Sequence, residues 1–386
     1  MYLFLTPEHI AYLKQTLSRK DGEPRFLRFE LEYAGETAMQ KGPWSVTNSP
    51  AGAVSGNPHD YYSVGPYWWP DPSAIDPKKA PYIRRDGEVN PERYLYHHVS
   101  DFSQLADAGV TLCAAGTLLD HPEYLDRAAQ LYQIWFVDEK TRMNPHMEYA
   151  QAIPNICNGR GIGIIELGSL DRIIFSLGFL EAAGKYSGLL SQMDQWISQM
   201  LDWLLNSSNG KEEAVHGNNH EVYYNVHVGM CALRLGRKDV LEQIFRNYRQ
   251  RILPQQMQPD GSLPLELERT KSLHYSLYCL DAMAILCEMA HWAGEDLWHY
   301  EVEGRSISKG IDFLLPALNN PYTWSYQEID GEFPRDRLAL QWAALRLERP
   351  DLAQLNQKLR AGQRLWIANN PFPKTLMEGY FFNLQR

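Results

Sequence analysis

The segment from His216 to Glu221 combines side chains that can bind an anion and move a proton. Two adjacent amides, Asn218 and Asn219, stand directly before His220 at the start of a predicted helix. Amide donors beside free backbone N–H groups and the positive end of a helix dipole favour an anion such as a carboxylate, and Asn219 suits the capping position. His220 can exchange a proton near neutral pH. A capping pair with a structural histidine explains the same residues equally well.

His216 and His220 also have the i, i+4 spacing of zinc ligands. The order here is His-Gly-Asn-Asn-His instead of His-Glu-x-x-His, and Gly217 weakens a helix through the first histidine. No cysteine or third ligand lies nearby in the sequence. We therefore expect no metal and no cofactor.

A second cluster, which begins at Arg269, places a phenol close to positive charge. Arg269 and Lys271 bring that charge to Tyr275, and a neighbouring cation favours the phenolate form of a tyrosine. A phenol in such a position can donate or accept a proton during catalysis. The alternative is an exposed, charged helix start with Tyr275 in the core.

A third element, Gly159-Arg160-Gly161-Ile162-Gly163, surrounds one arginine with glycines. It has neither a preceding strand nor the GxGxxG order, so we exclude a dinucleotide site. Glycine neighbours would let a substrate approach Arg160 closely, and arginine binds carboxylates in bidentate fashion. A structural turn is an equally good alternative.

Residues 41–93 form a long stretch without helical periodicity that is dense in proline, glycine and aromatic residues. A loop of this length inside a compact domain is usually functional or disordered, and its aromatic density argues against disorder. We therefore predict an ordered lid or cleft wall whose ring faces stack on sugars. Rings that merely pack on helices are the alternative. The candidate ligand-binding side chains in this stretch are Tyr61, Tyr62, Tyr67, Trp68 and Trp69.

Most of the remaining chain has the apolar spacing of amphipathic helices. Strand-like alternation is scarce, no fixed sequence period is found, and no linker divides the chain. We therefore predict an all-α fold of helical hairpins, with residues 1–386 forming one catalytic domain. The predicted helices span residues 6–18, 101–119, 122–137, 168–184, 187–206, 221–236, 239–251, 272–293, 305–317, 335–347 and 351–367.

The composition excludes several classes of protein. With 44% hydrophobic and 22% charged residues, the 386-residue chain has ordinary globular composition. Its 37 Lys and Arg against 47 Asp and Glu give a net charge of −10, which leaves no basic field for nucleic acid. No apolar stretch is long enough to span a membrane. Five cysteines without CxxC spacing predict no disulfide framework.

Taken in order along residues 40–320, these elements resemble the alginate lyase superfamily of polysaccharide lyases. The resemblance lies in four segments: Asn218-Asn219-His220, Arg269 to Tyr275, Gly65-Pro66-Tyr67-Trp68-Trp69-Pro70, and Tyr82 to Pro91. Residues 144–163 are also similar to the family. The Trp-Trp-Pro loop is most similar to bacterial lyases that act on alginate or glucuronan. The resemblance implies an (α/α) barrel or toroid of helical hairpins and metal-independent β-elimination at a uronic acid.

The resemblance also implies roles for individual residues. Asn219 would neutralise the substrate carboxylate with Asn218 beside it, and His220 would be a base or a second neutralising group. Tyr275 would be the catalytic phenol, and Arg269 would keep it poised or bind the carboxylate. The expected substrate-binding residues are Asn218, Tyr61, Tyr62, Tyr67, Trp68, Trp69, Arg160, Tyr224 and His274. The sequence departs from the family pattern directly after His220 and in the separation of Arg269 from Tyr275.

The partner expected from this resemblance is an acidic polysaccharide, while the sequence predicts no oligomeric state. A net charge of −10 repels a polyanion at long range. We therefore expect local attraction from the cations that flank the aromatic stretch, which are Lys78, Lys79, Arg84, Arg85 and Arg93.

Two other functions stay open. A glycoside hydrolase on the same architecture would need two carboxylates across a cleft. The candidates for such a pair are Asp60, Asp71, Glu221, Glu266 and Glu268. A non-catalytic glycan-binding protein would use Trp68 and Trp69 as a platform.

The N-terminus does not resemble a signal peptide, because it has no basic segment and only a short apolar run. The protein is cytoplasmic if Met1 is its native start. If a leader has been removed, it is periplasmic or secreted, as its relatives mostly are.

Overall fold

The computed structural model describes residues 3–75, 81–329 and 337–363. These residues cluster into two compact units. The first unit comprises Gly35–His216, and the second comprises the described residues of Tyr2–Ala34 and Gly217–Arg386. The single catalytic domain expected from the sequence stays a prediction.

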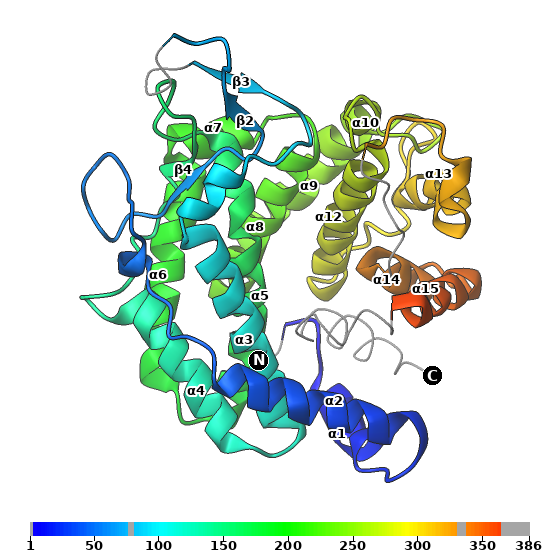
Figure 1. Ribbon diagram of the computed structural model, residues 1–386. Coiled ribbons are helices and arrows are strands. Elements are labelled where there is room, and N and C mark those ends of the chain that lie inside the picture. Colours follow the sequence, from blue (N-terminus) through cyan, green and yellow to red (C-terminus); the bar gives the residue numbers. More distant parts are fainter. Residues whose placement is uncertain (1–2, 76–80, 330–336, 364–386) are drawn as a thin grey trace. The chain divides into compact units, whose positions relative to one another are not determined.

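Helices in the first unit pack around α3, which is apolar on most of its faces (Figure 1). It contacts α4 on one side and α5 on another, which explains why its buried residues are not confined to one stripe. The Tyr132 hydroxyl and Ser176 Oγ lie 2.7 Å apart and join α4 to α5. The helices of this unit are α3 (His98–Leu118), α4 (Pro122–Tyr132), α5 (Gly168–Ala183), α6 (Ser187–Asn206) and α7 (Ser208–Glu213), while α2 (Gly22–Met39) runs into it from the second unit.

Two short strand pairs lie within or beside the aromatic stretch. Strand β1 (Tyr62–Val64) pairs in parallel with β4 (Tyr149–Ala152), and β2 (Trp68–Pro70) pairs antiparallel with β3 (Tyr82–Arg84). The described part of the stretch, without residues 76–80, therefore has defined strands and turns, as predicted, and its role as a lid stays a prediction. The short 3₁₀- and π-helical elements of this unit are η1 (Val46–Asn48), η3 (Pro91–Leu95), η4 (Gln133–Val137) and η5 (Gly161–Leu167).

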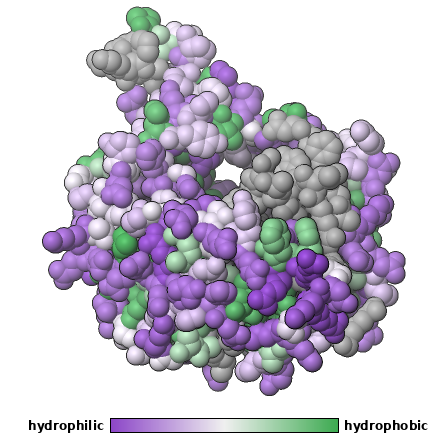
Figure 2. Space-filling view, turned by 60° about the horizontal axis from the view of Figure 1, so that its bottom comes forward, coloured by the Kyte–Doolittle hydropathy of each residue, from purple (hydrophilic) through white to green (hydrophobic). Residues whose placement is uncertain are grey.

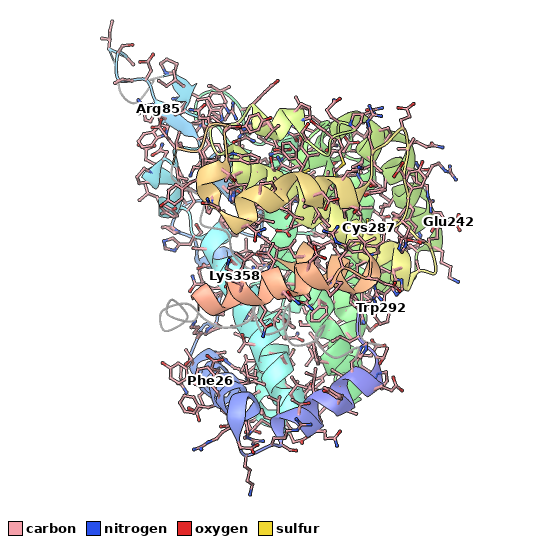
Figure 3. The ribbon with its side chains drawn as sticks, turned by 90° about the vertical axis from the view of Figure 1, so that its right-hand side faces the viewer. Phe26, Arg85, Glu242, Cys287, Trp292 and Lys358 are labelled. Carbon is pink, nitrogen blue, oxygen red and sulfur yellow. The ribbon has the colours of Figure 1, made fainter. Side chains whose placement is uncertain are left out.

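In the second unit, α12 is the helix around which its neighbours pack. It contacts α8, α11, α13 and α14, and α8 also contacts α9 (Figure 1). Cys287 and Trp292 lie on α12 (Figure 3). The elements of this unit are α1 (Pro7–Leu17), α8 (Asn219–Leu235), α9 (Lys238–Asn247), η6 (Tyr248–Ile252), α10 (Leu253–Gln256), α11 (Pro264–Leu267), α12 (Ser272–Trp292), α13 (Ile307–Asn319), η7 (Pro321–Thr323), α14 (Leu338–Arg346) and α15 (Pro350–Gln363).

The predicted all-α class is confirmed, and most predicted helices agree with observed ones to within a few residues. The main omission is α2. Its buried residues do recur at helical spacing, at Leu27, Leu31, Ala34 and Ala38, but Phe26 and Phe29 lie off this stripe, are 50% and 63% exposed, and obscure it in the sequence. The predicted helix 122–137 ends as α4 followed by a π-helical turn, η4. Residues 335–336 and 364–367 of two predicted helices lie outside the described residues.

All five cysteines are free, which confirms the prediction of no disulfide framework. Within the described ranges, no helix is both long and apolar enough to cross a bilayer. The face in Figure 2 is largely hydrophilic, with apolar residues scattered over it. No group of three His, Cys, Asp or Glu side chains suited to hold a metal ion occurs among the residues that the structure describes.

Candidate active site

The start of α8 is capped by Asn218, and the expectation that Asn219 caps it is wrong. Asn218 has an extended backbone, and its Oδ1 accepts a hydrogen bond of 3.0 Å from the backbone N–H of His220. A capping side chain must stand outside the first helical turn to reach back to it, which puts Asn219 at the first helical position. Asn218 and His220 are half-buried, whereas Asn219 is 1% exposed.

Asn219 is held by a carboxylate from a distant part of the sequence. Its backbone N–H donates to Oε1 of Glu266 at 2.7 Å, and its Nδ2 lies 2.9 Å from Oε1 and 2.8 Å from Oε2. Burial raises the pKa of Glu266 above its ordinary value, and the hydrogen bonds from Asn219 oppose that rise. From its sequence context, Glu266 was a candidate only for the carboxylate pair of a glycoside hydrolase.

The loop before α8 is held by Glu221, whose side chain is 1% exposed. Glu221 accepts hydrogen bonds from Arg251 Nε at 2.6 Å and from the backbone N–H of Gly217 at 2.9 Å. Gly217 has a φ of +87°, a conformation that side-chain-bearing residues rarely adopt. Glu221 therefore has partners that explain its burial structurally.

Tyr275 lies in the first turns of α12 and is 7% exposed. The guanidinium carbon of Arg269 is 3.7 Å from the centre of its ring, close enough for a cation–π interaction. The start of α12 is held by Glu328, whose Oε2 accepts from the backbone N–H of Leu273 at 2.8 Å. A carboxylate at a helix N-terminus is favoured by the helix dipole, so Glu328 fixes the turn that carries Tyr275.

Three rings stack on the neighbouring faces of α8 and α12. The centroids of Tyr223 and Tyr278 are 4.1 Å apart, and those of His274 and Tyr278 are 6.1 Å apart with nearly parallel planes. His274 was expected from the sequence, whereas Tyr223 and Tyr278 were not. The spacing of His274 and Tyr278 along one helical face was the signal available for the second ring. Tyr224, which was expected to bind substrate, is only 7% exposed.

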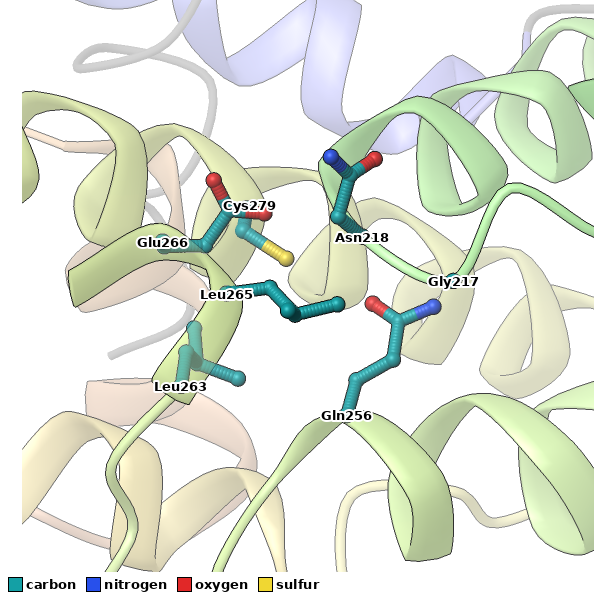
Figure 4. Close-up of a pocket in the computed structure, with 7 residues that line it drawn as sticks. All are labelled: Gly217, Asn218, Gln256, Leu263, Leu265, Glu266 and Cys279. Atoms are coloured by element: carbon teal, nitrogen blue, oxygen red, sulfur yellow. The ribbon is translucent and has the colours of Figure 1, made fainter. Parts of the chain in front are cut away.

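A small, partly open pocket lies beside the start of α8, with about 150 Å³ of space that includes open solvent (Figure 4). The Asn218 amide and the Glu266 carboxylate line it together with Gln256 and Leu265. Burial raises the pKa of the neighbouring Cys279 thiol well above its ordinary range, and this keeps the thiol protonated. The remaining lining residues are Gly217 and Leu263.

In the first unit, Arg160 is held by a buried glutamine and a tryptophan ring. Its Nε donates to the Gln151 carbonyl at 2.8 Å, its Nη2 donates to Gln151 Oε1 at 3.2 Å, and its guanidinium lies 5.7 Å from the Trp68 ring centre. Burial lowers the pKa of Arg160 from its ordinary value. A Cβ at Gly65 would stand 2.7 Å from Arg160 and 2.8 Å from Trp68, so glycine there makes room for both.

The glycines around Arg160 serve the chain's own packing. A Cβ at Gly159 would stand 2.8 Å from the Tyr149 backbone, and one at Gly163 would stand 2.5 Å from Ala150. The interpretation that these glycines make room for a substrate is therefore replaced by that of a structural turn.

The aromatic side chains of the first unit differ in accessibility. Tyr61 is 0% exposed, and its hydroxyl donates to Glu166 at 3.0 Å, so its ring face is covered and it belongs to the core. Tyr62 is half-buried against Tyr96, and burial raises its pKa to about 12. The rings of Tyr67, Trp68 and Trp69 are half-exposed.

The arginines that flank the aromatic stretch contact other side chains of the protein. Arg84 pairs with Asp86 at 2.5 Å, and Arg85 lies 5.0 Å from the Trp69 ring centre on the β2–β3 hairpin (Figure 3). Arg93 stands 3.8 Å from the buried Glu166. Lys78 and Lys79 lie outside the described residues.

The sequence profile of the alginate lyase family matches residues 45–324. The structure of an alginate lyase from Bacteroides ovatus matches with a TM-score of 0.87 and 30% identity, over 97% of this chain and 98% of that one. Alginate lyase A1-III from Sphingomonas species A1 matches with a TM-score of 0.54 and 18% identity, over 88% of this chain and 86% of that one. No curated protein sequence matches significantly.

A His-to-Ala variant of A1-III in complex with a tetrasaccharide also matches, with a TM-score of 0.54 and 17% identity, over 82% of this chain and 86% of that one. At such sequence identities, a structural match shows a similar fold and nothing further. The matches agree with the all-α toroid class expected from the sequence.

Proposed function

Since this chain belongs to the alginate lyase family and is a polysaccharide lyase, we propose that it cleaves alginate, or a glucuronan, by β-elimination without a metal ion. The observation that carries the mechanism is the arrangement around Glu266. Its carboxylate binds Asn219 beside His220, and its backbone carbonyl accepts from the Arg269 N–H at 3.2 Å. One residue thus joins the helix-start amides to the segment that leads to Tyr275.

The chemistry requires a stabilised negative charge. Elimination removes the proton on C5, next to the uronate carboxylate, and expels the oxygen on C4. Hydrogen-bond donors on the carboxylate stabilise the enolate-like charge that develops in the transition state. Asn219 with the neighbouring Asn218 supplies amide donors at the positive end of α8, and His220 adds a titratable group at the same place.

Tyr275 supplies the proton transfer. A phenolate at this position removes the C5 proton, and a phenol donates a proton to the leaving oxygen. The Arg269 cation over the ring holds it in place by a cation–π interaction. Where the C5 hydrogen and the C4 oxygen lie on one face of the sugar, Tyr275 carries out both proton transfers. Where they lie on opposite faces, His220 carries out one of the two transfers. The protein would then accept more than one uronate epimer. Equal losses of activity on both epimers in His220→Ala would overturn this epimer assignment.

The first unit has candidate groups of its own for binding a uronate polymer. The two bonds to Gln151 occupy Nε and Nη2 of Arg160, so its Nη1 edge is left for a carboxylate. The half-exposed rings of Trp68 and Trp69 offer faces for sugar rings.

The test is a panel of polymannuronate, polyguluronate, glucuronan and a neutral glucan, with a chelator present. The C4–C5 double bond of the product is followed by ultraviolet absorbance, with Tyr275→Phe as the inactive control. A rise on a uronan that Tyr275→Phe does not give supports the proposal and identifies the substrate. New reducing ends without absorbance would replace it with hydrolysis, and a rise that the chelator abolishes would overturn metal independence.

A further inference from the structure

We propose that Glu266 is a positioning residue, which sets the orientation of the Asn219 side-chain amide for binding the substrate carboxylate. The inference rests on the proposed function, because it concerns the same site. Glu266 lies on the four-residue helix α11, before the segment from Arg269 to Tyr275.

The geometry of the contact leaves one amide hydrogen for a ligand. Asn219 Nδ2 is almost equally far from the two Glu266 oxygens, at 2.9 and 2.8 Å. Near this midline of the carboxylate, a single N–H serves both oxygens, and the second N–H of the amide is not used by Glu266. The backbone N–H of Asn219 adds a bond of 2.7 Å, which fixes the residue relative to the same carboxylate.

The charge of Glu266 selects this orientation over the opposite one. A carboxylate only accepts hydrogen bonds, so Nδ2 turns toward it and Oδ1 turns away. Asn219 Oδ1 is buried and has no hydrogen-bond partner among the described residues. An unpaired buried acceptor costs free energy, so the observed orientation depends on the bonds to the ionised Glu266. A group that also donates at this position would favour a turned amide, with Oδ1 facing it and Nδ2 displaced.

Protonation of Glu266 would supply such a donor. The titratable and charged groups around it are Arg269, His220 and, in the same pocket, Cys279, which Glu221 also influences. Burial raises the pKa of Glu266, while the bonds from Asn219 and the charges of Arg269 and His220 oppose the rise. Activity should therefore fall as the pH decreases through a range above that of an ordinary carboxyl group. A variant without the carboxylate should therefore lose the part of the decrease in activity at low pH that protonation of Glu266 causes.

The first experiment compares E266Q with the wild type and with E288Q. The glutamine keeps the shape of the side chain but presents an NH₂ group, which favours the turned amide. We expect kcat to fall about tenfold to hundredfold in E266Q, with little change in KM. The decrease in activity at low pH that protonation of Glu266 causes in the wild type should be absent from E266Q. Glu288 is a matched control because it is 0% exposed, binds Arg346, and stands 13 residues, or about 20 Å, beyond Tyr275 on α12.

E288Q should lose thermal stability and keep its kcat. A wild-type kcat in folded E266Q would overturn the proposal. So would a loss of kcat in E288Q equal to that in E266Q, because a general loss of stability would then explain both.

A second measurement does not depend on turnover. In protein labelled with ¹⁵N-asparagine, the Asn219 side-chain signal is assigned by its loss in Asn219→Ala. It should shift with pH in the wild type and not in E266Q, and a pH-independent wild-type signal would overturn the proposal. If the wild type cleaves no uronan, the proposed function fails, while this signal still decides whether Glu266 controls the amide.

Discussion

The guanidinium carbon of Arg269 lies 3.7 Å from the centre of the Tyr275 ring. A cation over an aromatic face is attracted to the ring and stabilises negative charge that develops on the phenol oxygen. Tyr275 is 7% exposed, so solvent screens this interaction little. The pair therefore holds the Tyr275 ring in place and brings a positive charge to the phenol that the proposed elimination uses.

Removal of the Tyr275 hydroxyl should abolish most turnover. In Tyr275→Phe the buried ring still fits, and only the group that transfers the proton is lost. We expect kcat on the identified uronan to fall at least about hundredfold, with unchanged binding of the polymer in calorimetry. Tyr248→Phe is the control, because Tyr248 is also buried and contacts Cys287 in the core. Substantial turnover in Tyr275→Phe would contradict the assignment of this phenol.

Removal of the cation over the ring should slow the reaction. In Arg269→Gln the Tyr275 ring loses the cation–π contact that holds it in place. A loss of about 0.5–2 kcal/mol corresponds to a decrease in kcat of about 2- to 30-fold at neutral pH. Steady-state kinetics check this, with Arg237→Gln, an exposed arginine paired with Asp239, as the control. A raised KM with an unchanged kcat would mean that Arg269 binds substrate instead.

Substitution of Arg160 should weaken binding and leave the chemical step intact. Lysine keeps the charge but loses the paired bonds to Gln151 and the planar contact with Trp68. Because charged hydrogen bonds contribute about 1.5–3 kcal/mol, we expect KM of Arg160→Lys to rise about tenfold or more. Steady-state kinetics on long and short oligosaccharides measure it. A loss confined to kcat would place Arg160 at the reacting centre instead.

The buried Glu166 predicts a specific pH dependence of stability. Burial raises its pKa above the reference value of 4.5, although Arg93 and the hydroxyls of Ser63 and Tyr61 oppose the rise. The folded protein therefore binds this proton more tightly than the unfolded chain. The free energy of unfolding should decrease as the pH rises from the ordinary carboxyl value through the raised one.

Denaturant titrations of the wild type and Glu166→Gln across this range isolate the contribution of Glu166. The variant cannot ionise at this position, so the stability of the wild type relative to it should decline with increasing pH. A difference that grows with pH would mean that the charged form of Glu166 is the stabilised one.

The long helices were predictable because their signal is local. Helices α8 and α12 were expected at 221–236 and 272–293 and are observed at Asn219–Leu235 and Ser272–Trp292. Their apolar residues recur at helical spacing over several turns, and that spacing requires no knowledge of their neighbours. Helix α11 has four residues and is too short to show any period.

The partners of the site residues were not predictable in the same way. Asn219 and Glu266 are 47 positions apart, and nothing in either local sequence specifies their contact. The choice of Asn218 over Asn219 as the cap depends on one residue of register in the backbone. Tyr61 and its neighbour Tyr62 have the same residue type, and only packing decides that the first is covered and the second half-exposed.

The amino-acid sequence by itself determined the all-α class, the family, and the residue types available for elimination, because periodicity and short motifs are properties of neighbouring residues. The compartment remains a prediction from it. The tertiary structure decided which carboxylate holds Asn219, which cation lies over Tyr275, and which aromatic faces are open. Burial, hydrogen bonding and cation–π contact depend on segments that are distant in sequence and meet only when the helices pack.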